Sequence, residues 1–265
     1  MKKLSISNIA WSAENDNTVY SWMVKHAYSG LEIAPTRIFT ESPYDSLQDA
    51  KTWSDQINKE YGFVVPSMQS IWFGRQENMF NSDEELRKLI DYTKKAIIFA
   101  QTIKCRNLVF GCPRNRNIAE GRNSDVAIDF FKEIGDYAAE HGTIIGMEAN
   151  PSIYNTNYIN NTASALTLIK TVDSKGFKLN LDVGTMIQND ETVNDLIDNV
   201  KYINHVHVSE PGLKAITERK LHNELYEILK SEKYDGFVSI EMGRTEDLSI
   251  IEKTMIYIKE VFSNS

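Results

Sequence analysis

The chain has 265 residues, 42% of them hydrophobic and 25% charged, which are ordinary proportions for a globular protein. Its net charge of −8 argues against a nucleic-acid-binding surface, which normally needs a basic patch, and no apolar stretch reaches the roughly 18 residues of a membrane span. The only cysteines, Cys105 and Cys112, form no CxxC pair, so we expect a cytoplasmic protein without a disulfide framework.

Short apolar runs alternate with longer helical patterns along the whole chain. Several of these runs are rich in Val and Ile and bounded by Gly, Asn or Asp, as is typical of strands. The predicted strands cover residues 3–11, 30–35, 63–69, 107–111, 143–149, 177–183, 202–208 and 236–242. The first of them begins near the N-terminus and is too polar to be a signal peptide.

Amphipathic patterns predict helices between these strands. Apolar residues recur at intervals of three and four, and Ser82 fits the N-cap of the longest pattern. The clearest predicted helices cover residues 83–103, 124–142, 162–176 and 247–262, and a shorter pattern covers 191–200.

Eight strands alternating with about eight helices predict a single α/β domain over residues 1–265, a (β/α)8 TIM barrel. A doubly wound open sheet is the alternative. That fold would usually bring a glycine-rich nucleotide-binding turn after the first strand, and neither GxGxxG nor GxxxxGK[ST] occurs in the sequence.

Four successive predicted strands end in a side chain that can bind a metal. These side chains are Glu148, Asp182, His207 and Glu241. Active sites of such barrels lie at the C-terminal ends of the strands, where we expect the four to meet. A single acid at a strand end is weak evidence, but four in a row are harder to obtain by chance. Three carboxylates and one imidazole predict one divalent ion: Mn²⁺, Mg²⁺, Co²⁺ or Zn²⁺.

Two histidines stand two residues apart in the seventh predicted strand. Side chains alternate in a strand, so His205 and His207 share one face. His207 lies nearer the C-terminal end and is predicted to be the metal ligand. His205 lies about 6–7 Å deeper, so we expect it to support the site by hydrogen bonding rather than to bind the ion directly.

Other polar and aromatic side chains near the strand ends are candidates for contacting a substrate. These candidates are Trp11, Gln69, Trp72, Arg75, Asn150 and Ser209. The tryptophans could stack on a sugar ring or belong to the core. Arg75, Arg114 and Arg116 could hold an anionic group or be surface charges. Cys112 is expected to be a packed or loop thiol, because no histidine is placed by sequence to activate it.

On these residues, the chain resembles the sugar phosphate isomerase/epimerase superfamily of xylose isomerase-like TIM barrels. The resemblance runs from "GLEIAPTR" to "SIEM", and the ordered set Glu148, Asp182, His207 and Glu241 has separations close to those of ketose 3-epimerases. It implies that these four residues bind one divalent metal and that the two glutamates also transfer the proton.

Two positions depart from the epimerase pattern. Thr185 stands where those enzymes place a substrate-binding His, and Leu213 stands where they place an Arg. The sugar-binding shell is therefore expected to differ. Endonuclease IV, a member of the superfamily with three metals, fits worse. Its site needs further histidines early in the barrel, and residues 1–140 contain only His26.

The sequence thus predicts a metal-dependent isomerase or epimerase acting on a small carbohydrate. Glu148 and Glu241 would transfer the proton through a metal-stabilised enediolate. A lyase or hydrolase on the same barrel and a catalytically silent sugar-binding barrel remain as alternatives. No nucleic-acid or membrane partner is expected, and the sequence leaves assembly into a homo-oligomer open.

Overall fold

A computed structural model describes residues 3–263. Seven strands form one sheet in which every neighbouring pair is parallel, in the order β2-β1-β7-β6-β5-β4-β3. The strands are β1 (Lys3–Ser7), β2 (Gly30–Glu32), β3 (Leu108–Phe110), β4 (Ile145–Met147), β5 (Phe177–Asp182), β6 (Ile203–Val208) and β7 (Phe237–Ile240).

The segment predicted as a strand at 63–69 closes the ring between β2 and β3 but forms only isolated bridges. Met68 bridges Ile33 on one side and Leu108 on the other. Backbone hydrogen bonds run from Ile33 N to Ser67 O (3.2 Å) and from Val109 N to Met68 O (2.8 Å). Pro66 has no N–H and cannot donate to a ladder. The prediction of a barrel is confirmed, with this position filled by an irregular strand.

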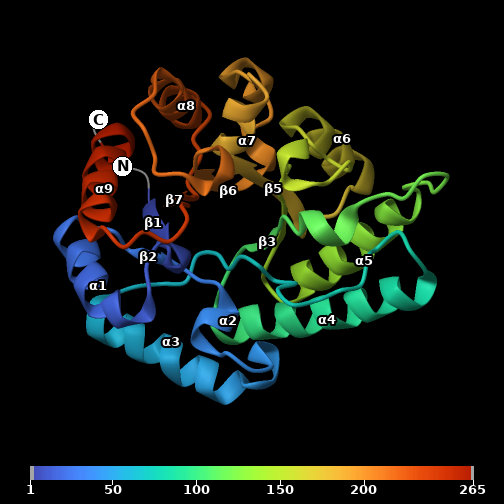
Figure 1. Ribbon diagram of the computed structural model, residues 1–265, viewed down its shortest axis with the longest axis horizontal. Helices are drawn as coiled ribbons and strands as arrows, with labels where there is room; N and C mark the ends of the chain where they lie inside the picture. The colour runs from blue at the N-terminus through green and yellow to red at the C-terminus, as the bar shows by residue number, and fades with distance from the viewer. Residues whose placement is uncertain (1–2, 264–265) are drawn as a thin grey trace.

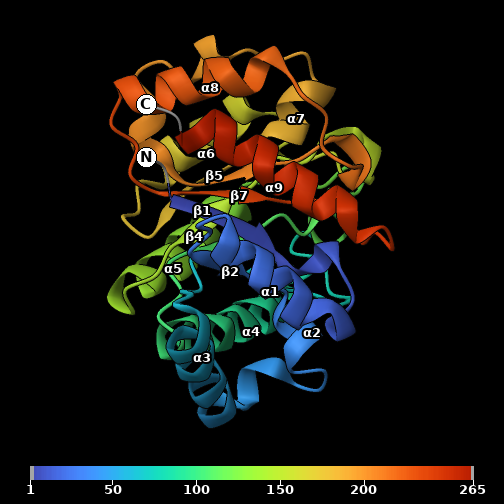
Figure 2. The same ribbon diagram turned by 90° about the vertical axis from the view of Figure 1, so that its left-hand side faces the viewer.

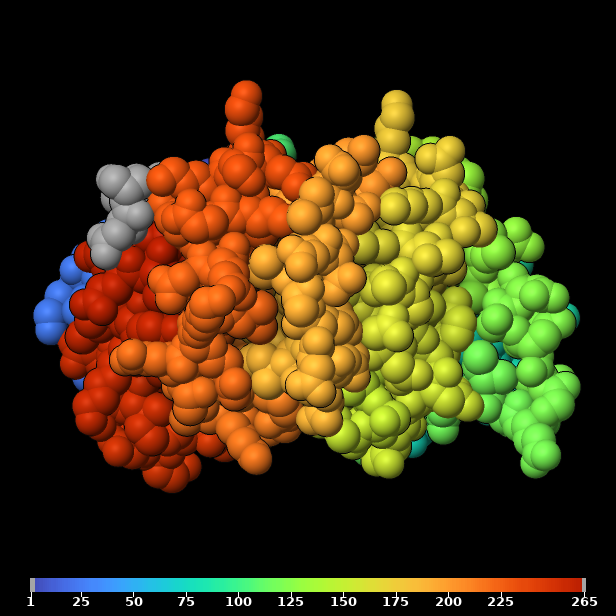
Figure 3. Space-filling model, turned by 90° about the horizontal axis from the view of Figure 1, so that it is seen from above, coloured from blue at the N-terminus to red at the C-terminus, as the bar shows by residue number. Residues whose placement is uncertain are grey.

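The helices form an outer ring around the strands (Figure 1), and a side view shows them on both sides of the sheet (Figure 2). They are α1 (Asp16–Lys25), α2 (Pro35–Ile38), α3 (Leu47–Tyr61), α4 (Asp83–Thr102), α5 (Val126–Glu140), α6 (Thr162–Val172), α7 (Val183–Gln188), α8 (Lys220–Ser231) and α9 (Leu248–Ser263). Across one side of the surface, α9 to α5 succeed one another in red, orange, yellow and green (Figure 3).

Ser82 caps α4 as predicted, because its hydroxyl accepts a hydrogen bond from Glu85 N. The pattern at 191–200 does not form an α-helix. It makes short 3₁₀ turns at Val193–Leu196 and Val200–Tyr202, because Asp198 adopts a left-handed conformation (φ 62°) and several residues have low helix propensity. Leu196 and Val200 are still buried by these turns.

The apolar core lies mainly between the sheet and the helices, whereas the barrel interior is partly polar. Asn107 on the strand-β3 side donates to Ser67 Oγ (3.0 Å) and to Asn180 Oδ1 (3.1 Å). Buried amides are tolerated there because they satisfy one another. None of the described helices is both long and apolar enough to span a membrane.

Candidate metal centre

The four side chains predicted to bind a metal converge at the C-terminal ends of β4 to β7. Asp182 ends β5 and pairs in register with His207 of β6, while Glu148 and Glu241 directly follow β4 and β7. One ligand atom from each residue lies within 4.8 Å of those of the other three, and all four side chains are buried. Parallel strands end at one edge of a barrel, which is why residues 34 or 25 positions apart in sequence meet here.

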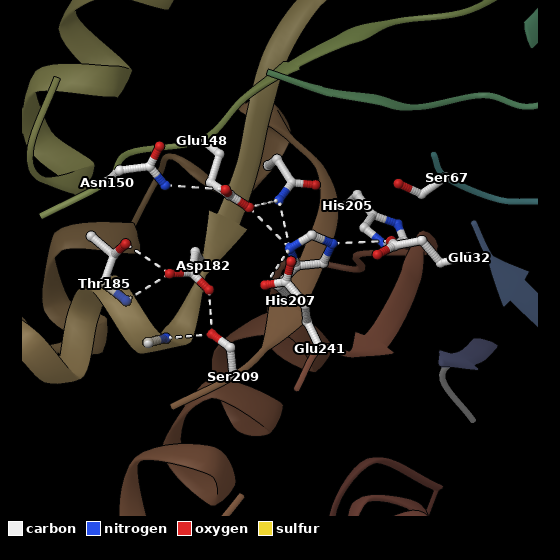
Figure 4. Close-up of polar contacts among 12 residues, drawn as sticks. Glu32, Ser67, Glu148, Asn150, Asp182, Thr185, His205, His207, Ser209 and Glu241 are labelled. Atoms are coloured by element: carbon white, nitrogen blue, oxygen red, sulfur yellow. Dashed lines mark hydrogen bonds and ion pairs between the residues drawn. The ribbon is translucent and has the colours of Figure 1, made fainter. Parts of the chain in front are cut away.

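The His207 ring occupies the middle of the group (Figure 4). Its Nδ1 lies 2.9 Å from Glu148 Oε1 and 3.3 Å from Glu241 Oε2. Asn180 Nδ2 also donates to Glu148 Oε1, at 2.8 Å. Gly111 makes room for this glutamate, because a Cβ at that position would stand 2.8 Å from Glu148 Oε2.

Asp182 is fixed by its neighbours rather than by the histidine. Thr185 contributes its backbone N–H and its hydroxyl to Asp182 Oδ2, each at 2.7 Å. Ser209 donates its hydroxyl to Asp182 Oδ1, and Gly184 N donates in turn to Ser209 Oγ at 2.8 Å. Thr185, which replaces the histidine of the epimerase pattern, is therefore engaged in holding this carboxylate.

Glu32, at the end of β2, is a buried acid in contact with His207 that the sequence did not predict as part of the site. Its Oε2 contacts His207 Nε2 at 3.0 Å and His205 Nε2 at 2.8 Å. With the Gln69 amide oriented to satisfy both acids, its nitrogen donates to Glu32 Oε1 at 2.7 Å and to Glu241 Oε1 at 2.9 Å. A signal was present: Glu32 is the one acid in the apolar run "GLEIAP".

His205 therefore reaches His207 through Glu32. The two rings lie edge to face, with their centroids 5.3 Å apart, and His205 is not one of the four converging residues. A second group, made of Glu32 and the two histidines, also gathers three potential ligand atoms. Glu32 contacts Nε2 of both rings, and its contact with His207 Nε2 orients that ring so that Nδ1 faces the three carboxylates.

Burial and charge together shift the pKa values of these groups. Burial raises the pKa of Glu148 and of Glu241, and the contact of each with His207 only partly offsets it. Burial also raises the pKa of Asp182, and the charge of Glu148 adds to the effect. Burial would lower the pKa of His207, but the surrounding carboxylates, Glu32 foremost, raise it well above its usual value. Three buried carboxylates thus share one imidazole.

A cavity of about 170 Å³ opens above these residues. Of the predicted substrate contacts, Gln69, Asn150 and Ser209 line it. Asn150 Nδ2 donates to Glu148 Oε2 at 3.2 Å. Tyr154 and Leu213 line it too, and neither was predicted as a substrate contact, because their loops have no periodic pattern that places a side chain. Among the described residues, those lining the cavity include no Lys or Arg.

Three other predicted contacts lie outside this cavity. Trp11 is fully buried and donates to Asp16 Oδ1 (2.7 Å), and Trp72 is buried and donates to Thr93 Oγ1 (2.8 Å). Arg75 pairs with Glu77 and lies over the Tyr92 ring. These side chains follow strand ends in sequence, but their loops turn them toward the helices.

Two further loop candidates, Arg116 and Cys112, are packed at or behind the cavity. Arg116 is fully buried and donates to Asn150 Oδ1 at 2.7 Å, so it supports a cavity residue from behind. Cys112 lines the cavity, and burial raises the pKa of its thiol to about 12.

The donor set fits a divalent cation. Carboxylate oxygens and one imidazole nitrogen suit Mn²⁺, Mg²⁺, Co²⁺ and Zn²⁺. The three buried carboxylates face a cavity lined by no Lys or Arg among the described residues, and the cationic groups near them are the His207 imidazole and the buried Arg116 behind Asn150. Uncompensated buried charge is costly, and a bound cation would relieve it.

Comparison with known proteins identifies the family. The model of the xylose isomerase-like TIM barrel family matches residues 21–261, and the chain belongs to that family. The predicted resemblance is confirmed. No curated protein shows significant sequence similarity to the chain.

Solved structures with the same fold cover almost the whole chain. The apo 3-keto-D-glucoside 4-epimerase from E. coli has a TM-score of 0.74 at 20% identity, with 98% of this chain and 100% of that chain covered. D-psicose 3-epimerase from Clostridium cellulolyticum, solved with D-tagatose, has a TM-score of 0.76 at 16% identity and coverages of 98% and 99%. A family 2 AP endonuclease from Brucella melitensis has a TM-score of 0.73 at 17% identity, with the same coverages.

Proposed function

We propose that the chain is a divalent-metal-dependent isomerase or epimerase of a small, uncharged sugar or sugar-derived substrate. The observation that carries the proposal is the convergence of Glu148, Asp182, His207 and Glu241, with one ligand atom of each within 4.8 Å of the others, at the C-terminal ends of four strands. Membership of the xylose isomerase-like family and the likeness to solved structures named as sugar epimerases support it.

The four converging residues are the proposed ligands of one divalent ion. Bound there, such an ion would polarise a substrate carbonyl and stabilise the negative charge that develops when a neighbouring C–H is deprotonated. Asp182 is held by Thr185 and Ser209, and His207 is held by Glu32. These hydrogen bonds keep the ligand atoms in place before any substrate arrives.

Glu148 and Glu241 are the proposed proton-transfer groups. Each has one oxygen that contacts His207 and one that does not: Oε2 of Glu148 and Oε1 of Glu241. These second oxygens accept hydrogen bonds from the neutral amides of Asn150 and Gln69. One carboxylate would remove the proton from carbon and the other would return it. Return to the same carbon from the opposite face gives epimerisation, and return to the adjacent carbon gives isomerisation.

The cavity favours an uncharged substrate. Its polar lining consists of amides, hydroxyls and carboxylates, with no Lys or Arg among the described lining residues. A phosphate group would meet Glu148, Asp182 and Glu241 without a cationic side chain to offset the repulsion. Leu213, in place of the epimerase arginine, makes one wall apolar. Gln69, Asn150 and Tyr154 are the proposed partners of substrate hydroxyls.

Deuterium wash-in tests the proposal. The metal-loaded protein is incubated in D₂O with uncharged ketoses and aldoses and with their phosphate esters, and C–H exchange is followed by NMR. We expect exchange in the uncharged sugars and none in the protein stripped of metal. Elimination of water would indicate a lyase, and binding without exchange in any sugar would indicate a silent barrel. Exchange confined to phosphate esters would contradict the uncharged substrate.

A further inference from the structure

The barrel has a second cavity at the opposite end, where the strands begin. It measures about 470 Å³ and is lined by residues at the starts of three strands: Lys3 of β1, Ile203 of β6 and Phe237 of β7. Its lining also includes His205, which is only 1% exposed, so the cavity reaches from the surface into the barrel interior. Cavities of this size commonly bind small molecules.

The lining of this cavity is strongly basic. Six cationic side chains line it, against the two carboxylates of Glu232 and Asp235. The cations are Lys3, Lys104, Arg106, Lys178, Lys201 and Lys233. The chain as a whole carries a net charge of −8, so this concentration of positive charge runs against its composition. We call this basic cavity the N-terminal pocket.

The six cations have no partners that account for their placement. Within the described part of the chain, no ion pair or side-chain hydrogen bond joins any of their charged groups to another residue. The interactions that these cations do make are weaker: Lys104 attracts the Asp55 carboxylate without pairing with it, and Lys201 Nζ lies 5.4 Å from the centroid of the Tyr202 ring. Glu232, one of the two acids, accepts a hydrogen bond from Asp198 N instead.

Basic residues often follow helices because they offset the helix dipole. Only Lys104 and Lys233 do so here, after α4 and α8, and neither ammonium bonds a helix carbonyl in the described residues. Both have left-handed backbones (φ 58° and 60°) at positions where helices usually place glycine. The helix ends therefore do not explain why a lysine stands at either position.

We propose that the N-terminal pocket binds a small, multiply charged anion whose charged groups are phosphates or carboxylates. Lysine and arginine recognise these groups through charge-assisted hydrogen bonds. A polymer such as nucleic acid fits less well, because the positive charge is confined to this one cavity while the chain as a whole carries a net charge of −8. The pocket lies at the end of the barrel opposite the metal centre, so it constitutes a separate site.

Calorimetric titration tests this proposal with two probes, inorganic phosphate and propane-1,3-disulfonate. The first is a common biological anion, and the second stays dianionic and binds metals weakly. We expect saturable binding with a Kd of about 1 mM or lower, weakened by added salt. Absence of saturable binding by both probes would overturn the proposal.

Two double variants locate the binding. Arg106→Gln/Lys201→Gln removes two exposed cations of the pocket, and Lys59→Gln/Lys253→Gln removes two exposed cations outside it, so both lower the net charge equally. We expect the first to raise the Kd by about 10-fold or more and the second to leave it nearly unchanged. Equal weakening by both pairs would show only a response to net charge and would contradict a built site.

Two further variants test whether weaker binding reflects a loss of folding and whether the pocket is independent of the candidate metal centre. Lys104→Gly/Lys233→Gly removes two pocket cations while relieving two left-handed backbones, so the Tm should not fall although binding weakens. Asp182→Asn alters only the opposite end of the barrel and should keep the binding. Loss of binding in Asp182→Asn, or tighter binding of a short single-stranded DNA than of both small anions, would overturn the assignment.

Discussion

The two ends of the barrel carry opposite charges and treat them differently. At the C-terminal end, three carboxylates are buried, and each is hydrogen-bonded by neighbours that fix its direction. At the N-terminal end, most of the six cations are exposed, and none is paired within the described residues. Held, buried charges suit chemistry that needs a fixed geometry. Exposed, unpaired charges suit recognition of an anion that arrives from solvent.

Polar side chains inside the barrel connect the two ends. His205 lines the N-terminal pocket and reaches His207 through Glu32. Asn204, in the same pocket lining, donates to Asn107 Oδ1 at 2.8 Å. Asn107 continues to Asn180, and Asn180 to Glu148. The interior is therefore a continuous hydrogen-bonded layer, which keeps the residues of the metal centre from shifting independently.

The largest expected effect is at the C-terminal end. Glu148→Gln and Glu241→Gln should each lower turnover by about 10²–10⁴-fold at saturating metal, because each removes a proposed acid or base. Glu140→Gln, an exposed change on α5, is the matched control. For an epimerase, one epimer should still exchange its C–H when the glutamate of the opposite face is changed. Identical loss of exchange with both epimers in both variants would contradict the two-base scheme.

The second prediction compares a thiol at each end. Burial raises the pKa of Cys112 at the C-terminal end to about 12, so its thiolate is scarce at pH 8. Lys201→Cys places a thiol among the remaining cations, which lower a thiol pKa. We expect iodoacetamide to modify the new thiol about 10²-fold faster than Cys112. The difference in pKa alone would give a larger ratio, but the Cys112 thiolate is the stronger nucleophile, which offsets part of it.

Peptide mass spectrometry distinguishes alkylation of Cys112 and of the new thiol from that of Cys105, the buried third thiol. The rate at Cys112 should rise about tenfold for each pH unit through pH 10, because it titrates only at higher pH, whereas the rate at position 201 should level off near pH 8.5. Equal rates at both sites would show that the two ends do not differ in their local electrostatic environment.

The third prediction separates the two histidines. His207→Ala should abolish metal binding, because it removes a proposed ligand. His205→Ala should weaken metal binding by only about 10–100-fold, since His205 acts through Glu32. Metal content after dialysis and calorimetric titration with Mn²⁺ measure both effects. Complete loss of metal in both variants would place His205 among the ligands, and the Asn17→Ala surface variant should change nothing.

Much of this arrangement could be predicted from the order of the strands. Strand-end position identified Glu148, Asp182, His207 and Glu241, because parallel strands place their C-terminal ends on one edge whatever their separation in sequence. Gln69, Asn150 and Ser209 reach the cavity for the same reason.

Residues beyond the strand ends could not be placed in this way. Trp11, Trp72 and Arg75 turn toward helix partners, and loop conformation decides that direction. Glu32 satisfies the same strand-end rule, but a lone acid in the run "GLEIAP" does not reveal that its partners are the two histidines of β6 across the barrel. The N-terminal pocket was not predicted because its cations are distributed from Lys3 to Lys233. The strand order brings them together, as it does the metal centre.

The smallest expected effect is that of the N-terminal pocket on the stability of the whole protein. Six cations around one cavity repel one another, so Arg106→Gln/Lys201→Gln should raise the free energy of unfolding slightly, by at most about 0.5 kcal/mol, at low salt. The gain should disappear near 1 M salt, where the Debye length falls to about 3 Å. Urea denaturation at two salt concentrations measures it, with Lys59→Gln/Lys253→Gln as the reference pair.

If an anion occupies the pocket, adding propane-1,3-disulfonate should make the unmodified protein more stable than the variant, because the unmodified protein then gains binding energy that the variant lacks. A variant less stable than the unmodified protein at low salt without any anion would mean that the cations are paired in solution, and the contrast between the two ends would fail.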